Sequence, residues 1–403
     1  MLPAMSGTMP SRADPEPGPL VVAGAGAAGI AAAIAAARLG RQVWLVEARK
    51  RIGGTVTHTL IHTLGGLFDS TGRLLNHGLP AELVERLKNA DPATRPRPIG
   101  RVWVLDTDPH VYQQVVHAWL AELPAITVVH SSRIAGVHLQ DGRLTELDLA
   151  TPHGARAIHP STVIDATGTA EVARRVNHAL VRDPVALPAG GFIIRLRGAV
   201  PDCLRFPRGL DLVRQLRQAA AQGDLPPECA TVWLDTGLKA DEIYIKWAVP
   251  LPTDWRDTGV QADLHHRADQ TRDQLVRFLQ TMPAFAHSHG AEAGTLGIRD
   301  GGRIVGDYTL TEQDIRAGRR FPAATARCCW PIELWSPAGD VTLDYLPPDS
   351  WYEIPPAALK VRGIANLWAA GKCLSADARA QASARVVGSC WAMGEAAATA
   401  AAS

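Results

Sequence analysis

Short apolar runs alternate with helix-forming segments in the N-terminal part of the chain. Residues 20–23 form an apolar run, residues 30–39 are rich in alanine, and residues 42–46 form a second apolar run before Glu47. Strands buried on both faces of a parallel sheet show such continuous runs, whereas half-exposed strands alternate. This order predicts a strand–helix–strand unit with parallel strands, in which Gly40 ends the helix.

The next segment mixes helical patterns with a proline-rich stretch. Residues 80–89 and 111–123 have the apolar spacing of helices, and Asp108-Pro109 is a capping sequence for the second helix. The proline-rich residues 91–100 predict a surface loop.

Short strands separated by turn sequences follow. The turns are expected at Asp141-Gly142 and His153-Gly154, since such pairs permit the backbone of a tight hairpin. These strands predict an antiparallel meander that leads back into the parallel sheet.

Residues 184–293 have a different pattern, with three strand-like runs, a long helical segment at 263–282 and no second glycine motif. We therefore expect an α/β fold. Its Rossmann-like domain, a parallel sheet plus a β-meander, would be formed by residues 20–183 and 294–403, with an inserted α+β substrate-capping domain at 184–293. Residues 1–19, with five prolines and no apolar run, are expected to be a disordered lead-in.

Three glycines lie where the first strand meets the first helix. Gly24 would allow the turn, Gly26 would let the backbone approach a phosphate, and Gly29 would let the helix pack closely on the strand. A helix N-terminus in this setting binds pyrophosphate. Glu47 follows Gly24 by 23 residues, close to the ~20-residue spacing of an acid that binds ribose hydroxyls. The sequence therefore predicts a dinucleotide site.

Charge and cysteine content exclude some classes of partner. The chain has 41 Lys plus Arg and 40 Asp plus Glu, so no overall field attracts nucleic acid or an anionic membrane. The apolar run at 20–37 is mostly Ala and Gly, which disfavours membrane insertion. Six cysteines without paired metal-ligand spacing indicate reduced thiols and a cytoplasmic protein with no metal site.

Beyond Glu47, the sequence resembles FAD-binding proteins of the glutathione-reductase-type superfamily. The resemblance is carried by Gly53-Gly54 six residues after Glu47, by the meander that ends in residues 166–168, and by the tail around Gly371. In order along the chain, these motifs are similar to the broad bacterial family of FAD-dependent oxidoreductases. The sequence departs from that family at residues 300–302, and Lys372 stands where arginine is common.

The resemblance implies FAD as the cofactor. The residues that it places at the cofactor are Gly24, Gly26, Ala27, Ala28, Gly29, Glu47, Ala48, Arg49, Gly53, Gly54, Thr55, Ile134, Ala166, Thr167, Gly168, Gly371, Lys372, Asp377, Ser383, Arg385 and Val386. It also implies that the last helix, expected at 383–401 with a small residue as its N-cap, directs its N-terminus at the flavin. A helix N-terminus and Arg385 would favour the negative charge of reduced flavin, and Arg385 could instead be an intradomain ion-pair partner.

Two histidines and two arginines are candidates for catalysis. His58 and His62 are four residues apart and are expected to share a side; one of them would take a proton beside the flavin, or both are polar residues bonded inside a loop. Arg299 and Arg303 would anchor a substrate carboxylate, or they are structural.

These features predict an enzyme that oxidises a small organic substrate by hydride transfer to flavin N5. The alternative is a monooxygenase that hydroxylates its substrate through a flavin hydroperoxide, and a further one is a non-catalytic flavoprotein or binding scaffold. The expected partner is a small molecule, with no nucleic acid and no membrane insertion. The sequence leaves open the electron acceptor (oxygen, NAD(P) or a carrier protein) and the oligomeric state.

Overall fold

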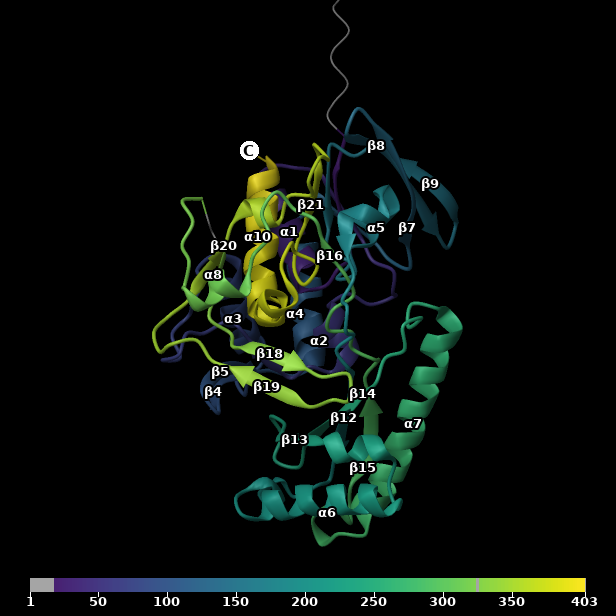
Figure 1. The fold of residues 1–403 in the computed structure, drawn as a ribbon, viewed down its shortest axis with the longest axis vertical. Helices are drawn as coiled ribbons and strands as arrows, with labels where there is room; N and C mark the ends of the chain where they lie inside the picture. Colours follow the sequence, from purple (N-terminus) through teal and green to yellow (C-terminus); the bar gives the residue numbers. More distant parts are fainter. Residues whose placement is uncertain (1–17, 324–325, 403) are drawn as a thin grey trace, which may run out of the picture.

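The computed structural model describes residues 18–323 and 326–402. A five-stranded parallel sheet has the order β21-β10-β1-β2-β6; its edge strand β21 is labelled beside α1 and α10 in Figure 1. Its strands are β21 (Leu367–Ala369), β10 (Thr162–Asp165), β1 (Leu20–Ala23), β2 (Val43–Val46) and β6 (Ile126–Val129). The central strand β1 is buried along its length, as its continuous apolar run predicts. The α/β fold class is confirmed. The expected lead-in falls outside the described residues, apart from residues 18 and 19.

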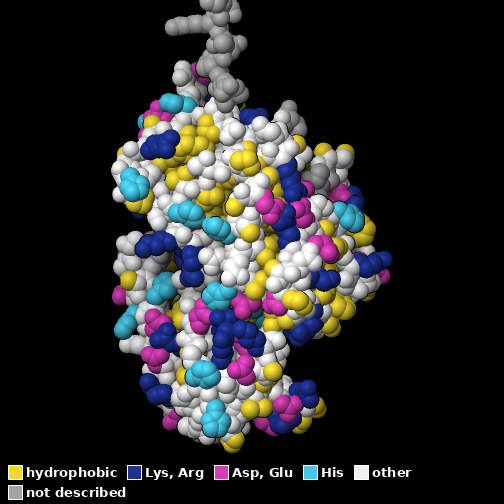
Figure 2. All heavy atoms as spheres, turned by 180° about the vertical axis from the view of Figure 1, so that it is seen from behind, with side chains coloured by type: hydrophobic (Ala, Val, Ile, Leu, Met, Phe, Trp, Pro, Cys, Tyr) yellow, Lys and Arg dark blue, Asp and Glu magenta, His cyan; other side chains and the backbone are white. Residues whose placement is uncertain are grey.

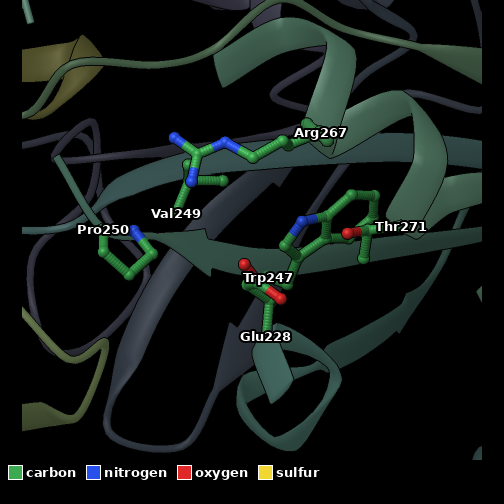
Figure 3. A pocket seen from close by; sticks show the side chains of 7 residues that line it. Glu228, Trp247, Val249, Pro250, Arg267 and Thr271 are labelled. Carbon is green, nitrogen blue, oxygen red and sulfur yellow. The ribbon is translucent and has the colours of Figure 1, made fainter. Parts of the chain in front are cut away.

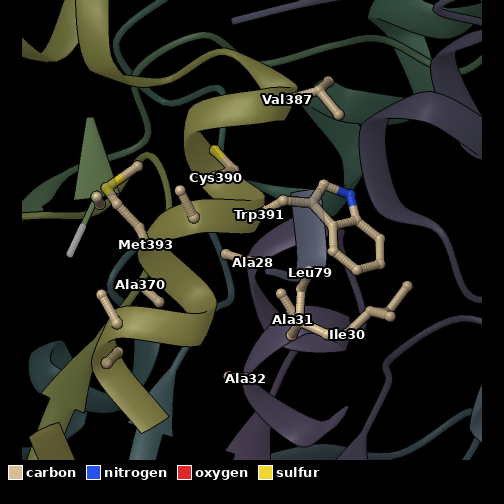
Figure 4. Packing of buried hydrophobic residues seen from close by; sticks show 14 of the residues in the cluster. Ala28, Ile30, Ala31, Ala32, Leu79, Ala370, Val387, Cys390, Trp391 and Met393 are labelled. Carbon is tan, nitrogen blue, oxygen red and sulfur yellow. The ribbon is translucent and has the colours of Figure 1, made fainter. Parts of the chain in front are cut away.

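Two alanine-rich helices, α1 (Ala27–Arg38) and α10 (Val387–Ala402), pack side by side against this sheet (Figure 4). Their small side chains allow a close approach, since a Cβ at Gly394 would lie 2.1 Å from the carbonyl oxygen of Ala28. Larger side chains fill the flank of the pair. Trp391 is fully buried, stacks on Trp119 at 5.6 Å and donates its indole N–H to the Tyr112 hydroxyl.

The antiparallel meander has the expected turns. Its strands are β7 (Arg133–Gln140), β8 (Arg143–Thr151) and β9 (Gly154–Ile158), and they pair in that order. Asp141 and Gly142 have φ of 47° and 72°, the positive values that a two-residue hairpin turn of type I′ needs.

The proline-rich stretch is not the surface loop that its composition predicts. Arg95–Ile99 form strand β4, which pairs with β5 (Val102–Asp106) in a sheet of order β3-β5-β4, where β3 is Thr63–Gly65. Because β4 is an edge strand, Pro96 and Pro98 need not donate to a further neighbour. Two prolines at alternate positions are therefore tolerated.

A second hydrophobic core lies in the region that we call the cap. Its antiparallel sheet, the cap sheet, has the order β13-β14-β12-β15, with strands Trp233–Thr236, Ile243–Val249, Gly190–Arg197 and His289–Ala293. The helices α6 (Arg208–Gln222) and α7 (Thr258–Gln280) contribute buried leucines to the same core. The strand β15 ends at Ala293, and the domain boundaries at 184 and 293 stay a prediction.

The C-terminal helix begins later than expected. A short helix, α9 (Ala378–Ala384), precedes α10, and its N-cap is Asp377, whose side chain accepts from the Ala380 amide. Ser383 is therefore not an N-cap. The remaining helices and strands are α2 (Gly54–Thr59), α3 (Leu79–Ala90), α4 (Pro109–Ala121), α5 (Glu171–Val176), α8 (Glu312–Arg316), β11 (Val181–Arg182), β16 (Arg303–Ile304), β17 (Ala326–Cys328), β18 (Ile332–Trp335), β19 (Val341–Asp344) and β20 (Tyr352–Ile354).

The surface carries both signs of charge. On the face shown in Figure 2, basic and acidic side chains lie next to one another instead of forming a field of one sign. None of the described helices combines the length and the apolar character that a membrane span needs.

Candidate active site

The turn between β1 and α1 requires glycine at two positions. Gly24 has φ of 98°, and a Cβ there would lie 2.6 Å from the carbonyl oxygen of Ala166. A Cβ at Gly29 would lie 1.8 Å from the carbonyl oxygen of Gly24. The helix can therefore pack this closely on the turn only because both side chains are absent.

The N-terminus of α1 is open to a ligand. Gly26 is its N-cap, no side chain caps it, and its first turn holds no acidic residue. A Cβ at Gly26 would first meet the Cα of Gly54, at 3.8 Å. The Gly53 amide donates to the Ala25 carbonyl at 2.9 Å, so the second glycine pair lies against this turn. The arrangement exposes helix N–H groups at a site where the helix dipole favours an anion.

Glu47 connects the end of β2 to the same turn. Its carboxylate is buried and accepts from the Ala25 amide at 2.8 Å and from the Arg49 amide at 2.9 Å. A carboxylate has about four acceptor positions, so both oxygens retain capacity for ribose hydroxyls.

The segment after β10 and the segment after β21 approach the same helix end. The Ala166 amide donates to Ala23 at 2.8 Å, and the buried Asp165 carboxylate accepts from the amide and hydroxyl of Thr167. Burial raises the pKa of Asp165. A Cβ at Gly371 would lie 2.9 Å from that of Ala28, in the first turn of α1. Segments far apart in the chain therefore meet at one helix end.

A polar cluster lies between this part of the chain and the cap sheet. His62 is buried, and its ring stacks on Tyr244 of β14 with centroids 3.7 Å apart. Its Nε2 lies 3.4 Å from Asp235 Oδ2, and Arg97 Nη2 donates to the same oxygen at 2.6 Å. Burial alone would raise the pKa of Asp235, but His62 and Arg97 together lower it. Asp235 therefore faces the imidazole as a carboxylate.

A group of cations lies on the same side of the cap sheet. The Arg299 guanidinium is 3.8 Å from the ring centre of Trp335, and Lys246 Nζ is 5.0 Å from it. Arg299 also donates to the carbonyl of Ala189. Burial lowers the pKa of Lys246 to about 8. Burial and the nearby charge of Arg385 lower the pKa of Arg299.

Glu333 is an acid whose charge acts on both Lys246 and Arg299. It accepts from the indole N–H groups of Trp330 and Trp335 at 2.9 and 2.6 Å, and its Oε1 lies 3.8 Å from Arg385 Nη2. Burial would raise its pKa, but Arg385 and Lys246 hold the pKa below its usual value. Arg385 stands at the C-cap of α9, immediately before α10.

A family model for FAD dependent oxidoreductases matches residues 19–181 and 207–403. The chain belongs to this family. It is an enzyme of the FAD-dependent oxidoreductase class, and FAD is its cofactor. No curated protein matches the chain.

Three solved structures show distant similarity to the chain. A geranylgeranyl bacteriochlorophyll reductase-like protein from Thermoplasma acidophilum has 12% identity and a TM-score of 0.49, with 96% of this chain and 78% of that chain covered. The p-nitrophenol 4-monooxygenase of Pseudomonas putida has 11% identity, a TM-score of 0.42, and coverage of 70% and 67%. The anhydrotetracycline hydroxylase OxyS of Streptomyces rimosus has 11% identity, a TM-score of 0.44, and coverage of 72% and 54%.

The residues around the α1 N-terminus fit an FAD diphosphate and ribose. The fit rests on the uncapped helix end at Gly26, the absence of side chains at Gly24 and Gly29, and the spare acceptor positions of Glu47. Other predicted residues at or beside this place are Ala27, Ala28, Ala48, Arg49, Gly53, Gly54, Thr55, Ala166, Thr167, Gly168, Gly371 and Lys372. Two of the long side chains have protein partners: Arg49 donates to Thr295 Oγ1 at 3.0 Å, and Lys372 donates to the Ile298 carbonyl at 2.6 Å. Their contacts with FAD stay a prediction.

Three predicted cofactor residues have side chains that already bond to or pack against other parts of the protein. Asp377 accepts from the amides of Ala380 and Glu312. Ser383 lies inside α9, is fully buried and accepts from the Tyr352 hydroxyl at 2.8 Å. Ile134 packs in a hydrophobic core beside β1. Any contact of these residues with FAD would therefore come from the backbone. Val386 lies at the α9–α10 junction, against Gly66.

The expectation that His58 and His62 share a side is wrong. The helix α2 ends at Thr59, and Leu60 has a left-handed backbone with φ of 58°, so the regular spacing breaks between the histidines. His58 Nε2 pairs with the Arg51 carbonyl at 2.9 Å, and burial followed by the charge of Arg49 lowers the pKa of His58 to about 4. A group with that pKa is a weak base near neutral pH.

The two arginine candidates, Arg299 and Arg303, also differ in their contacts. Arg303 is buried, donates to the Ala376 carbonyl at 2.7 Å and lies 3.1 Å from Asp300. Its guanidinium is therefore bound by other parts of the protein. Arg299 alone faces the cap.

Sequence reasoning did not find the cap residues Lys246, Asp235 and Tyr244. The alternation in β14 carries a signal, because Ile243, Ile245, Trp247 and Val249 enter the cap core while the residues between them face the other way. A lysine in a strand that is otherwise buried indicates that this face of the strand meets a polar site and not only solvent.

Two further features lie away from this site. On the meander, the ligand atoms of His138, Glu146 and Asp148 lie within 4.8 Å of one another; of these, the histidine is exposed. A cavity of about 50 Å³ lies in the cap, between β14 and α7 (Figure 3). It is lined by Glu228, Trp247, Val249, Pro250, Arg267, Ala268 and Thr271. Trp247 points to the opposite side of β14 from Lys246, so this cavity is separate from the candidate active site.

Proposed function

We propose that this enzyme oxidises a small organic substrate held between the cap sheet and the α9–α10 junction, with His62 as the base. The observation that carries this is the environment of the His62 ring. Nε2 is buried and lies 3.4 Å from Asp235 Oδ2, and within the residues that the structure describes it has no hydrogen-bond partner. When bound, FAD supplies the acceptor of a hydride at its N5 atom.

Asp235 and Tyr244 prepare His62 for this role. The carboxylate 3.4 Å from Nε2 favours the tautomer with its proton on Nε2, which leaves Nδ1 as the accepting nitrogen. It also stabilises the imidazolium that forms when Nδ1 takes a proton. The stack on Tyr244 fixes the plane of the ring. Arg385 lies at the same boundary and would offset the negative charge that accompanies reduction.

The test is anaerobic reduction of the FAD-loaded enzyme by a panel of small alcohols, amines and hydroxy acids, followed by flavin absorbance. His62→Gln should retain FAD and slow the reduction about 10²–10⁴-fold. His58→Gln is the matched control, because His58 pairs with the Arg51 carbonyl, and should reduce at nearly the wild-type rate. Equal rates for wild type and His62→Gln would refute the role of His62. Incorporation of oxygen from O₂ into the product would assign hydroxylation instead.

A further inference from the structure

We propose that the substrate is an organic anion, and that Lys246 and Arg299 bind its carboxylate beside Trp335. This inference rests on the proposed function, because it names the substrate class of the same site. It draws on the placement of Lys246, on the charge balance around it, and on the chemistry of its neighbours.

The alternation of β14 places Lys246 on the face that bears the catalytic candidate. Tyr244 and Lys246 are two residues apart, so they project from the same side of the strand. Tyr244 stacks on His62 from that side. Lys246 is therefore directed at the boundary where His62 lies, whereas the adjacent Ile245 and Trp247 are buried in the cap core.

The charges at this boundary do not balance. Among the described residues, no carboxylate lies within ion-pair distance of Lys246 or Arg299, and both cations are only partly exposed. The surrounding charged groups are Asp235, Glu333, Asp106, Arg97 and Arg385. Asp235 is bonded by Arg97, and Glu333 by two indoles with Arg385 beside it. Arg97 is shared between Asp235 and Asp106, so Lys246 and Arg299 have no carboxylate partner of their own and cations outnumber carboxylates in this group.

Withdrawing cations from water without a counter-charge is unfavourable, and an anionic ligand removes that cost. The geometry favours a carboxylate. Arg299 offers a planar guanidinium, Lys246 offers a point charge, and Trp335 lies in contact with both cations. The same fold places His62 close by through Tyr244, so an acid held by its carboxylate would present its remaining atoms toward the base.

Benzoate and acetate serve as carboxylate probes of the FAD-loaded enzyme, with benzamide and acetamide as uncharged isosteres, in calorimetric titrations. At least one acid should bind tenfold or more tightly than its amide. Lys246→Met and Arg299→Met should each weaken binding of that acid about tenfold or more and leave amide binding and FAD content unchanged. Lys246→Arg, which keeps the charge, should retain binding within about threefold.

Lys360→Met is the matched control, because Lys360 also lies over a tryptophan, Trp368, at 4.6 Å, but away from the cap. It should bind the acid like the wild type. The inference is overturned if neither acid binds more tightly than its amide, or if Lys246→Met and Arg299→Met bind the acid as well as the wild type does. Failure of the proposed function is read separately, from the absence of bound FAD or from unchanged reduction in His62→Gln.

Discussion

Replacing Gly26 by alanine should weaken FAD binding while it leaves the apoprotein intact. Gly26 has φ of −83° and ψ of −174°, values that alanine adopts without strain. The added Cβ would meet nothing closer than the Cα of Gly54, at 3.8 Å, which is an ordinary van der Waals contact. The free energy of unfolding of the apoprotein should therefore change by no more than about 0.5 kcal/mol.

The methyl group would instead occupy the space in front of the α1 N-terminus, where the diphosphate is expected. Forcing an extra methyl against a packed group costs about 1–3 kcal/mol. FAD affinity should therefore fall by about 5- to 150-fold. Gly29→Ala should behave differently, because its Cβ would lie 1.8 Å from the carbonyl oxygen of Gly24 and the backbone itself must move. That variant should lose folding stability as well as FAD.

The assay pairs quenching of FAD fluorescence on binding with urea unfolding of the apoprotein. Gly259→Ala is the control, since it lies at the start of α7 in the cap, where only the Asp257 carboxylate, at 3.1 Å, has to adjust. It should bind FAD like the wild type. An FAD dissociation constant for Gly26→Ala within about twofold of the wild type would refute the placement of the diphosphate at this helix end.

Two further predictions concern charge and packing. Affinity for the carboxylate probe should fall about tenfold from about pH 7 to about pH 9 in titrations, because burial lowers the pKa of Lys246 to about 8 and only its protonated form attracts the anion. Burial and Arg385 lower the pKa of Arg299 only to about 9, so Lys246→Met should lose most of the dependence between about pH 7 and about pH 8, and an equal dependence there in the variant would contradict the assignment. Trp391→Ala should lower the free energy of unfolding by about 3–5 kcal/mol in urea titrations, since Trp391 is fully buried and its N–H donates to Tyr112. A loss below about 1 kcal/mol would contradict this packing.

The nucleotide-binding framework could be predicted because its signals are local. The glycines at 24 and 29 are required by contacts with residues of the same strand–turn–helix unit or its immediate neighbour in the sheet. The turn at Asp141-Gly142 and the N-cap at Asp108 likewise depend on residues next to them in the chain. Short-range chemistry decides such features, so composition and spacing are sufficient.

Two predictions were wrong because the local structure depends on pairing and capping contacts that composition does not show. Strand β4 forms because β5 supplies its hydrogen-bond partners. The proline content of residues 91–100 suggested a loop, but prolines are tolerated in an edge strand. The helix expected at 383–401 is interrupted, and Asp377 caps the first part while its other oxygen accepts from Glu312 of α8. The contact between Glu312 and Asp377 joins segments that are distant in the chain, whereas β4 and β5 are neighbours in the sequence.

Only some residues of the candidate active site could be predicted from the sequence. His62 and Arg299 were marked by their positions relative to the glycine motifs, but Asp235, Tyr244 and Lys246 are more than a hundred residues from His62 along the chain. Their approach depends on how the cap sheet docks. The sequence signal for these cap residues is the pattern in β14, where one lysine lies among buried apolar residues.

The proposed base and the carboxylate beside it come from opposite sides of the boundary with the cap. His62 follows α2, whereas Asp235 lies in β13 and Tyr244 in β14. Ion pairs cross the same boundary, from Arg97 to Asp235 and from Arg195 of β12 to Asp108. Because these pairs are largely buried, breaking one would leave an uncompensated charge. One of these pairs, Arg97 with Asp235, also holds the carboxylate that faces His62, so a weakened boundary should slow reduction of the flavin by substrate before it unfolds either core.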